Sequence, residues 1–518
     1  MKNNLIATLS LYSLALPLTA QNAMKTQQPN VILIYADDMG MGMLSCQGQK
    51  EFMTPNIDRL FRQGTQFNHA YACMVSAASR ASLLTGYFDT KKEKIKINGG
   101  NLMLNPKDPQ SDTPEEIDRI LQPREAKINN NDVVLPIGDY YMAQVFQKAG
   151  YVTGQIGKLE YGWVATRQQL KRHGWDHYYG YLDHVACHGY YPPYLFEDGN
   201  VVMLEGNTRT NCGKTNEPET DKAYQQRWDM TGKNIYAQDA FDEKMKAFIR
   251  TNKDKPFFLY HPTLLPHGPV MIPEVHEYVK HNPHLSQIEK EYASMVIRLD
   301  STVGMLMDEV EKQGIADRTL IIFASDNGHE IYYAQPGRVN KPWGRYDDCN
   351  NAYYSVAHGD VFNGNCSMRG FKRQNSDGAI RVPMAFYLPG VIPSATRLDD
   401  FVSICDLIPT FAEMTGITLS QSHKKDGISI WKCLTKNERL PRERHIMYTS
   451  YQGPAIVDGE GYKLRYNRIS KKYYLHNVIS DPQEKIDIAQ EEPTRYEQLK
   501  QLLLEECRGD INRGNCGY

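Results

Sequence analysis

The 518-residue chain has few cysteines, no excess of charge of either sign and no long apolar run beyond its N-terminus. Its 10 cysteines are too few for a fold built on disulfides, and they form no Cys-x-x-Cys pair and no Cys/His zinc spacing. Because 59 Lys and Arg face 61 Asp and Glu, the chain lacks the basic excess of a general nucleic-acid binder. Without a later run of about 20 apolar residues, we expect no membrane span.

The first 23 residues have the pattern of a secretory signal peptide. Lys2 precedes an apolar stretch from Leu5 to Leu18, and small residues follow, so we expect cleavage after Ala20 or Ala23. A buried N-terminal helix is the alternative. The prediction is an exported, periplasmic protein in which disulfides are permitted. Two pairings are open, Cys507 with Cys516 and Cys349 with Cys366.

Short apolar runs alternate with helical patterns over most of the chain, which predicts an α/β fold. Buried parallel strands are expected at Val31–Ala36, Pro256–Tyr260 and Leu320–Ala324. Residues 291–314 repeat an apolar side chain every three or four positions and end at Gly314, as one face of a helix does. We therefore expect a large mixed, mostly parallel sheet sandwiched between helices.

The chain changes character after about residue 410, where short, aromatic, turn-bounded segments predict a small antiparallel sheet and Thr494–Cys507 predicts a terminal helix. The expected strands are 445–451, 453–458, 461–467 and 472–477. The expected units are a signal peptide at 1–23, a large domain at 24–410 and a C-terminal α+β subdomain at 411–518. Two polar segments, 88–132 and 205–230, are expected as long functional insertions.

Acidic residues directly follow two of the predicted strands. Asp37 and Asp38 come after the first strand, and Asp326 and Asn327 come after another. Since ligands bind beyond the carboxyl ends of strands in open α/β sheets, the four side chains can converge on one cation. Three carboxylates and an amide suit a hard ion such as Ca²⁺ or Mg²⁺. Helix caps and turns are the alternative explanation.

Residues 75–86 (VSAASRASLLTG) predict a helix with Ser76 and Arg80 near its N-terminus, where an anion can bind. A serine hydroxyl needs activation to act as a nucleophile, and no histidine lies nearby in the sequence to supply it. From composition alone, an ordinary Ser/Ala-rich helix explains the segment.

The ordered set of motifs resembles the type I sulfatase family of the alkaline phosphatase superfamily. Ser76–Gly86 is similar to that family's signature, and the resemblance extends over almost the entire chain beyond the N-terminal segment. Further similar blocks are Asn30–Gly40, Thr54–Leu60, Gly150–Lys158, Pro266-His267, Ser325–Gly328, Arg369–Pro383, Asp406–Thr410 and Tyr474–Glu484.

The resemblance implies hydrolysis of sulfate esters through a formylglycine made from Ser76 after translation. One hydroxyl of the hydrated aldehyde would attack sulfur, and proton loss from the other would then eliminate sulfate. The implied calcium ligands are Asp37, Asp38, Asp326, Asn327 and residue 76. By the same resemblance, Arg80 would hold the hydrate, Lys158 and Lys372 would hold sulfate oxygens, and His267 would protonate the leaving alcohol.

The chain departs from the family pattern at two places. The usual Lys-Trp-His block reads Lys158-Leu159-Glu160, so the histidine that normally contacts the formylglycine is absent. Our hypothesis is that Glu160 takes its place as a base; alternatively, a histidine from an insertion fills the space. Residue 76 is serine rather than cysteine, which resembles enzymes of anaerobic, Bacteroides-like bacteria that are matured by a radical enzyme acting on serine.

The expected substrate is a sulfated glycan, attacked at a terminal sulfated galactose or N-acetylhexosamine of mucin O-glycans or glycosaminoglycans. The predicted substrate-binding residues are Glu330, His329, His173, Arg338 and Arg345. One alternative is a phosphatase or phosphodiesterase of the same superfamily, with a direct Ser or Thr nucleophile and two zinc ions, for which no second ligand set is visible. A non-catalytic glycan-binding protein is another alternative, and the retained motif residues disfavour it.

Overall fold

The computed structural model describes residues 28–91, 94, 101–130, 134–215, 219–341 and 352–512. The expected signal peptide and Arg345 lie outside these residues. Cys349 and Cys516 do so too, and each belongs to one of the two suggested disulfides, so neither pairing is described. Within the described ranges, no helix is long and apolar enough to cross a membrane.

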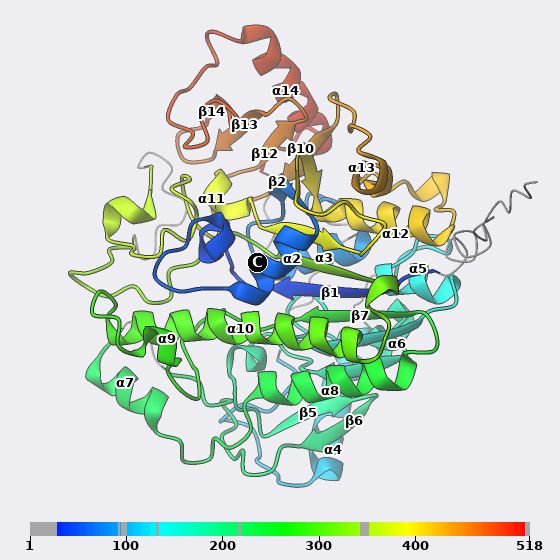
Figure 1. Cartoon of the computed structure of the whole chain (residues 1–518), viewed down its shortest axis with the longest axis vertical. Coiled ribbons are helices and arrows are strands. Elements are labelled where there is room, and N and C mark those ends of the chain that lie inside the picture. Colours follow the sequence, from blue (N-terminus) through cyan, green and yellow to red (C-terminus); the bar gives the residue numbers. More distant parts are fainter. Residues whose placement is uncertain are drawn as a thin grey trace, which may run out of the picture.

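In the described part of the chain, a ten-stranded mixed sheet has the order β10-β2-β9-β8-β1-β7-β3-β4-β5-β6, which runs along the long axis of the molecule (Figure 1). The strands are β1 (Asn30–Ala36), β2 (Thr65–Tyr71), β3 (Val152–Gly157), β4 (His177–Gly180), β5 (Tyr194–Glu197), β6 (Asn200–Met203), β7 (Phe257–Pro262), β8 (Thr319–Ser325), β9 (Met384–Tyr387) and β10 (Thr396–Ser403). Strands β8, β1, β7, β3 and β4 are parallel neighbours, while β9, β5 and β6 pair antiparallel. The mixed, mostly parallel sheet is confirmed.

Helices cover both faces of this sheet. One group contains α2 (Pro55–Gln63), α8 (Ala237–Asn252) and α10 (Gln287–Lys312), and the other contains α3 (Ser76–Thr85), α5 (Met142–Lys148) and α12 (Leu407–Thr415). Helices α8 and α5 both contact β3, α10 contacts α2 and α8, and α12 contacts α3 and α5. Because β1 lies between β7 and β8 under these helices, all seven of its residues are buried.

The predicted helix at 291–314 is α10, which begins earlier, after a capping box formed by Ser286 and Glu289. The chain leaves α10 through Gly314, which has a positive φ of 68°. The two polar segments expected as insertions each contain a helix. The other helices are α4 (Pro114–Asn129), α6 (Arg167–His173), α7 (Asp221–Trp228), α9 (Glu277–Lys280), α11 (Asp377–Ile380), α13 (Trp431–Lys436) and α14 (Pro493–Glu506).

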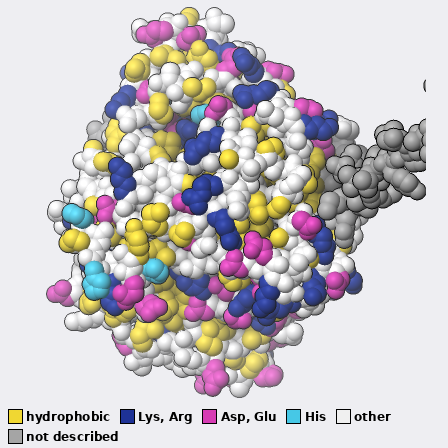
Figure 2. Space-filling view, in the orientation of Figure 1, with side chains coloured by type: hydrophobic (Ala, Val, Ile, Leu, Met, Phe, Trp, Pro, Cys, Tyr) yellow, Lys and Arg dark blue, Asp and Glu magenta, His cyan; other side chains and the backbone are white. Residues whose placement is uncertain are grey.

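The predicted C-terminal sheet is confirmed. In the ranges that the structure describes, it has four antiparallel strands, β11 (His445–Tyr448), β12 (Ala455–Asp458), β13 (Tyr462–Asn467) and β14 (Lys472–Asn477). With α14 it forms the end of the molecule beyond β10 (Figure 1). The boundary expected after residue 410 falls inside α12. On the face shown in Figure 2, Lys and Arg side chains lie among Asp, Glu and apolar ones, as the near-neutral composition leads us to expect.

A buried cluster of charges joins the C-terminal sheet to the large sheet domain. Lys463 of β13 lies 2.7 Å from Asp377 Oδ1 of α11 and 3.0 Å from Glu484 Oε1, and all three side chains are fully buried. Arg465 Nε adds a second contact to Glu484 at 3.2 Å. Burial raises the pKa of Glu484, but the charges of Lys463 and Arg465 outweigh it and hold that pKa below its usual value. The cluster therefore fixes the α11 segment against β13.

Replacing Lys463 by methionine should lower the free energy of unfolding by about 3–5 kcal/mol, because it removes the closest cation from two buried carboxylates. Asp377 would keep Arg381 at 3.7 Å, and Glu484 would keep Arg465 at 3.2 Å. Urea denaturation followed by fluorescence measures the loss. The matched control is Lys472→Met on the exposed side of β14, for which we expect a change below about 0.5 kcal/mol. Equal effects of the two substitutions would contradict the importance of this cluster.

Candidate active site

The two predicted acidic turns lie side by side at one edge of the sheet. Strands β1 and β8 are parallel neighbours with Ala36 opposite Ser325, so Asp37-Asp38 and Asp326-Asn327 leave the sheet together. Asp38 has a positive φ of 62°, a conformation that aspartate tolerates better than most residues. Its backbone N–H donates to Asp326 Oδ1 at 2.9 Å, which ties the first turn to the second.

The four side chains form a fully buried group of oxygen atoms. Asn327 Nδ2 donates to Asp38 Oδ1 at 2.7 Å, whereas Asn327 Oδ1 and Asp37 Oδ1 are buried and accept no hydrogen bond from any residue that the structure describes. Unpaired buried oxygens are costly unless something compensates for their lost hydration. Carboxylate and amide oxygens are the ligands that Ca²⁺ and Mg²⁺ prefer, so this group fits a hard divalent cation.

The charges around the three carboxylates also favour a bound divalent cation. Burial raises the pKa of Asp37, but the charges of Lys158, His267 and Arg80 outweigh it and hold that pKa well below its usual value. Asp38 has a pKa of about 2, because the charges of Lys372 and His267 overcome the effect of its burial. Burial and the neighbouring Asp37 raise the pKa of Asp326 to about 7. A cation would stabilise all three carboxylates in their charged form.

Ser76 is the first residue of α3, so its side chain lies at the positive end of that helix. Arg80, one turn later, donates from Nε to Ser76 Oγ at 2.8 Å and from Nη2 to Asp326 Oδ2 at 2.9 Å. Lys158, from the end of β3, lies 3.2 Å from Ser76 Oγ and 2.5 Å from Asp37 Oδ2. The predicted nucleophile position therefore lies between two cations and beside the carboxylates.

A second pair of side chains, Lys372 and His267, contacts Asp38. Lys372 Nζ donates to Asp38 Oδ2 at 2.7 Å and to His267 Nε2 at 3.2 Å, and the Tyr332 hydroxyl also donates to Asp38 Oδ2. His267 Nδ1 donates to the Gly268 carbonyl at 2.5 Å, which leaves Nε2 to accept from Lys372. Burial and the Lys372 charge lower the pKa of His267 to about 4.

Close backbone contact holds the Lys372 segment against the acidic turns. A Cβ atom on Gly328 would lie 2.0 Å from the Gly378 carbonyl oxygen, so only glycine fits there. The Gly328 N–H donates to the Ala379 carbonyl at 2.7 Å, and Lys372 N donates to the His329 carbonyl at 3.2 Å. The structure thus brings together the predicted site residues Asp37, Asp38, Ser76, Arg80, Lys158, His267, Asp326, Asn327 and Lys372.

Glu160 is buried, and its hydrogen bonds within the described part of the chain go to His173 and Trp175. Its Oε2 lies 2.6 Å from His173 Nδ1, and its Oε1 accepts from Trp175 Nε1 at 2.6 Å. The His173 ring in turn stacks on Tyr141, with ring centres 3.9 Å apart. Glu160 and His173 are therefore hydrogen-bond partners of each other. These contacts do not support Glu160 as the replacement base, nor His173 as a sugar ligand.

The other predicted substrate-binding residues that the structure describes also have protein partners. His329 is fully buried and pairs through Nε2 with the Tyr333 hydroxyl at 2.8 Å. Glu330 is 1% exposed and forms ion pairs with Lys341 and Arg373. Arg338 pairs with Glu289. The structure therefore gives no independent support to their roles in sugar binding, which stay predictions.

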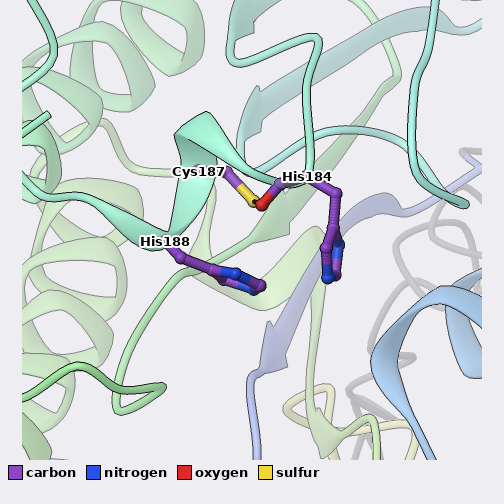
Figure 3. Close-up of side chains that lie close together, drawn as sticks. All are labelled: His184, Cys187 and His188. Atoms are coloured by element: carbon purple, nitrogen blue, oxygen red, sulfur yellow. Dashed lines mark hydrogen bonds between the residues drawn. The ribbon is translucent and has the colours of Figure 1, made fainter. Parts of the chain in front are cut away.

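Sequence reasoning missed two histidines that lie against the site. His188, at the end of the short helix η3 (Ala186–His188), stacks its ring on His267 with centres 4.1 Å apart and planes 2° apart. His184 and Cys187 lie beside it, and one ligand atom of each of the three residues lies within 4.8 Å of the others (Figure 3). The spacing His184-x-x-Cys187-His188 was the available signal, contrary to the expectation of no Cys/His metal spacing.

Comparison with known proteins decides the family. The family described as "Sulfatase" matches residues 29–417, and the family described as "N-sulphoglucosamine sulphohydrolase, C-terminal" matches residues 370–509. The chain belongs to the sulfatase family. It is a sulfuric ester hydrolase, and the sulfatase prediction is thereby favoured over the phosphatase alternative.

The relatives are distant but similar over most of their length. An N-acetylgalactosamine-6-O-sulfatase of Bacteroides thetaiotaomicron is 25% identical over 93% of this chain and 94% of its own. Human N-acetylgalactosamine-6-sulfatase is 26% identical over 83% of this chain and 70% of its own. The crystal structure of Ps i-CgsB shares the fold, with a TM-score of 0.69 and 24% identity over 94% of each chain.

If the acidic turns hold a cation, calcium added to metal-free sulfatase should raise its melting temperature. Binding at a hundredfold excess over Kd contributes about 2.7 kcal/mol of stability. Differential scanning calorimetry against chelator-treated protein measures the shift. Asp38→Asn should abolish the shift, while Asp317→Asn, an exposed control, should retain it. A shift that survives in the Asp38 variant would place the cation elsewhere.

Proposed function

We propose that this sulfatase removes sulfate from the terminal sugar of a glycan through a formylglycine derived from Ser76. The observation that carries the proposal is the position of Ser76 Oγ, held at 2.8 Å by Arg80 and 3.2 Å by Lys158 beside four buried metal-type ligands. Oxidation to formylglycine supplies, as its hydrate, the oxygen nucleophile that an unassisted serine cannot provide. A bound calcium ion supplies positive charge that polarises the sulfate ester.

The other side chains of the site each have a separate role in the proposed reaction. Arg80 orients the oxygen on residue 76, because its guanidinium is held by both Ser76 and Asp326. Lys158 and Lys372 flank the two acidic turns and offset the negative charge of the sulfuryl group in the transition state. His267 protonates the leaving alcohol, and the sulfate of the bound substrate supplies the negative charge that favours its protonated form.

The substrate class follows from the relatives. Bacterial and human relatives are named N-acetylgalactosamine-6-sulfatases, and each covers most of this chain. We therefore place terminal 6-O-sulfated N-acetylgalactosamine first among the substrates, followed by sulfated galactose and other N-acetylhexosamines of mucin O-glycans and glycosaminoglycans. The protein acts after export to a periplasm, and a serine-type radical maturase makes its formylglycine before export.

Protein produced together with a serine-type maturase should carry formylglycine at residue 76. Mass spectrometry of the tryptic peptide that contains this residue should show the loss of two hydrogens relative to serine. The same chain produced without a maturase is the control and should keep an intact serine. An active preparation whose peptide is entirely unmodified would refute the formylglycine mechanism.

Matured enzyme should release sulfate from 6-O-sulfated N-acetylgalactosamine and leave the matching phosphate ester nearly untouched. Ion chromatography of released sulfate and phosphate over a panel of defined saccharides measures the preference. Ser76→Ala should reduce sulfate release to the background rate, since no nucleophile remains at position 76. Preferred release of phosphate, or unchanged turnover in the Ser76 variant, would contradict the proposal.

A further inference from the structure

The histidine expected at position 160 is absent from the sequence, but two other histidines, His184 and His188, lie against the folded site. Glu160 stands where the family places a histidine, and both of its oxygens are occupied by His173 and Trp175. His184, in the turn before η3, and His188, at the end of η3, bring two imidazoles to the side of the site that contains His267. This turn is separate in sequence from every motif that carries the family resemblance.

The turn is held firmly. The backbone N–H groups of Val185 and Ala186 donate to Asp183 Oδ1 at 2.7 and 3.0 Å, and Leu102 N donates to Asp183 Oδ2 at 2.5 Å. The His184 N–H donates to the Trp163 carbonyl at 2.9 Å, and the two rings meet edge to face, 4.2 Å apart. The position of the His184 ring is therefore fixed by the fold.

The imidazoles form a continuous row. The rings of His184 and His188 meet edge to face with centres 4.3 Å apart, and His188 lies flat on His267 at 4.1 Å. Figure 3 shows the rings of His184 and His188 extending from the η3 turn toward the same side. Two of their nitrogens, His184 Nδ1 and His188 Nε2, are buried and have no hydrogen-bond partner among the described residues. Within those residues, neither nitrogen is therefore committed to another side chain.

The charged groups that act on His184 are those of the active site. Burial lowers its pKa well below the usual value, and the charges of Lys158 and His267 lower it further, whereas Asp37 raises it and Lys372 lowers it. These interactions show that the His184 ring lies within electrostatic reach of the active-site side chains. The pKa of His188 is lowered in the same way, by burial and by its two histidine neighbours.

A metal bound by His184, Cys187 and His188 would be a different use of these residues. Three features disfavour it. The Cys187 thiol already donates to the His184 carbonyl at 3.2 Å. Burial raises its pKa to about 12 against the opposing charges of Lys158 and Lys214, and those charges would also repel a metal cation. Metal binding needs the thiolate, which these surroundings do not favour.

We propose that His184 replaces the missing histidine as the base that releases sulfate, and that His188 positions the ring of His267. The inference rests on the proposed formylglycine mechanism. In the release step, the free hydroxyl on Cβ of residue 76 gives its proton to His184 and its O–H electrons form the carbonyl. The bond from Cβ to the sulfate oxygen breaks, and its electron pair leaves with sulfate. The proton then passes from His184 to solvent.

His184→Gln should separate the two halves of the reaction. The alcohol should still leave in a rapid first turnover, while steady-state turnover falls by about 10²–10⁴-fold because proton removal is slow. Rapid quenching and peptide mass spectrometry should then find residue 76 carrying one sulfuryl group. Added imidazole should partly restore turnover in His184→Ala, which a purely structural role does not predict. His281→Gln, at an exposed position, is the matched control and should behave as wild type.

His188→Gln should affect the first half of the reaction, in which the alcohol leaves. Turnover of the sugar sulfate should fall without accumulation of sulfated residue 76, because the acid His267 is misplaced. An aryl sulfate whose leaving group needs no protonation should be hydrolysed at nearly the wild-type rate. A loss that is equal for both substrates would contradict the positioning role.

A readout without turnover uses the unmodified Ser76 protein. Nitrogen NMR of the histidine rings should show His184 as a neutral imidazole whose signals shift when inorganic sulfate is added. Elemental analysis of the wild-type protein should find no zinc bound at His184, Cys187 and His188. Stoichiometric zinc that is present in the wild type and lost in Cys187→Ser would assign the three residues to a metal and overturn the proposal. Wild-type protein without formylglycine would overturn the proposed function itself, whereas normal maturation with wild-type kinetics in His184→Gln would overturn only the role of His184.

Discussion

The structure depends on balancing charge that is buried at the carboxyl ends of β1 and β8. Asp37, Asp38 and Asp326 have no access to solvent, and Arg80, Lys158 and Lys372 lie against them as buried cations. Buried charges are tolerated only when they are paired or bound to a metal. Two oxygens of the group, on Asp37 and Asn327, accept no hydrogen bond from the described residues, which suits a bound cation. The buried cations that neutralise the acidic turns also concentrate positive charge around Ser76.

This constraint explains why distant segments must meet. Lys372 reaches Asp38 with its segment in close contact with the second acidic turn, where Gly328 has no Cβ to keep the Gly378 backbone away. The segment that contains Lys372 continues into α11, and Asp377 of α11 is fixed by Lys463 of the C-terminal sheet. The small C-terminal sheet thus holds the segment that follows Lys372, although the sheet lies at one end of the molecule (Figure 1).

Much of the fold and of the acidic site could be predicted from the sequence. The runs VILIYA, PFFLY and LIIFA are apolar throughout because strands at the centre of a parallel sheet are covered on both faces, and they became β1, β7 and β8. The acidic residues after two of these strands converge because parallel strands end at the same edge. The order of the motifs, rather than any single one, pointed to the sulfatase family.

The contacts of single polar side chains could not be predicted in this way. Glu160 was expected at Ser76, but folding places His173 and Trp175 within hydrogen-bonding distance of it. The spacing His184-x-x-Cys187-His188 was visible in the sequence, but it could not show that His188 lies against His267, because that contact arises from a turn that only the folded chain defines. Glu330 and His329 follow the metal-type ligands in sequence, yet the backbone turns them into the interior.

The most direct test of the central claim is a crystal structure of the mature enzyme grown with calcium. The account predicts electron density for one cation bound by Asp37, Asp38, Asp326 and Asn327, and for two oxygens on Cβ of residue 76 in contact with Arg80 and Lys158. An empty acidic pocket, or a cation bound away from residue 76, would contradict it.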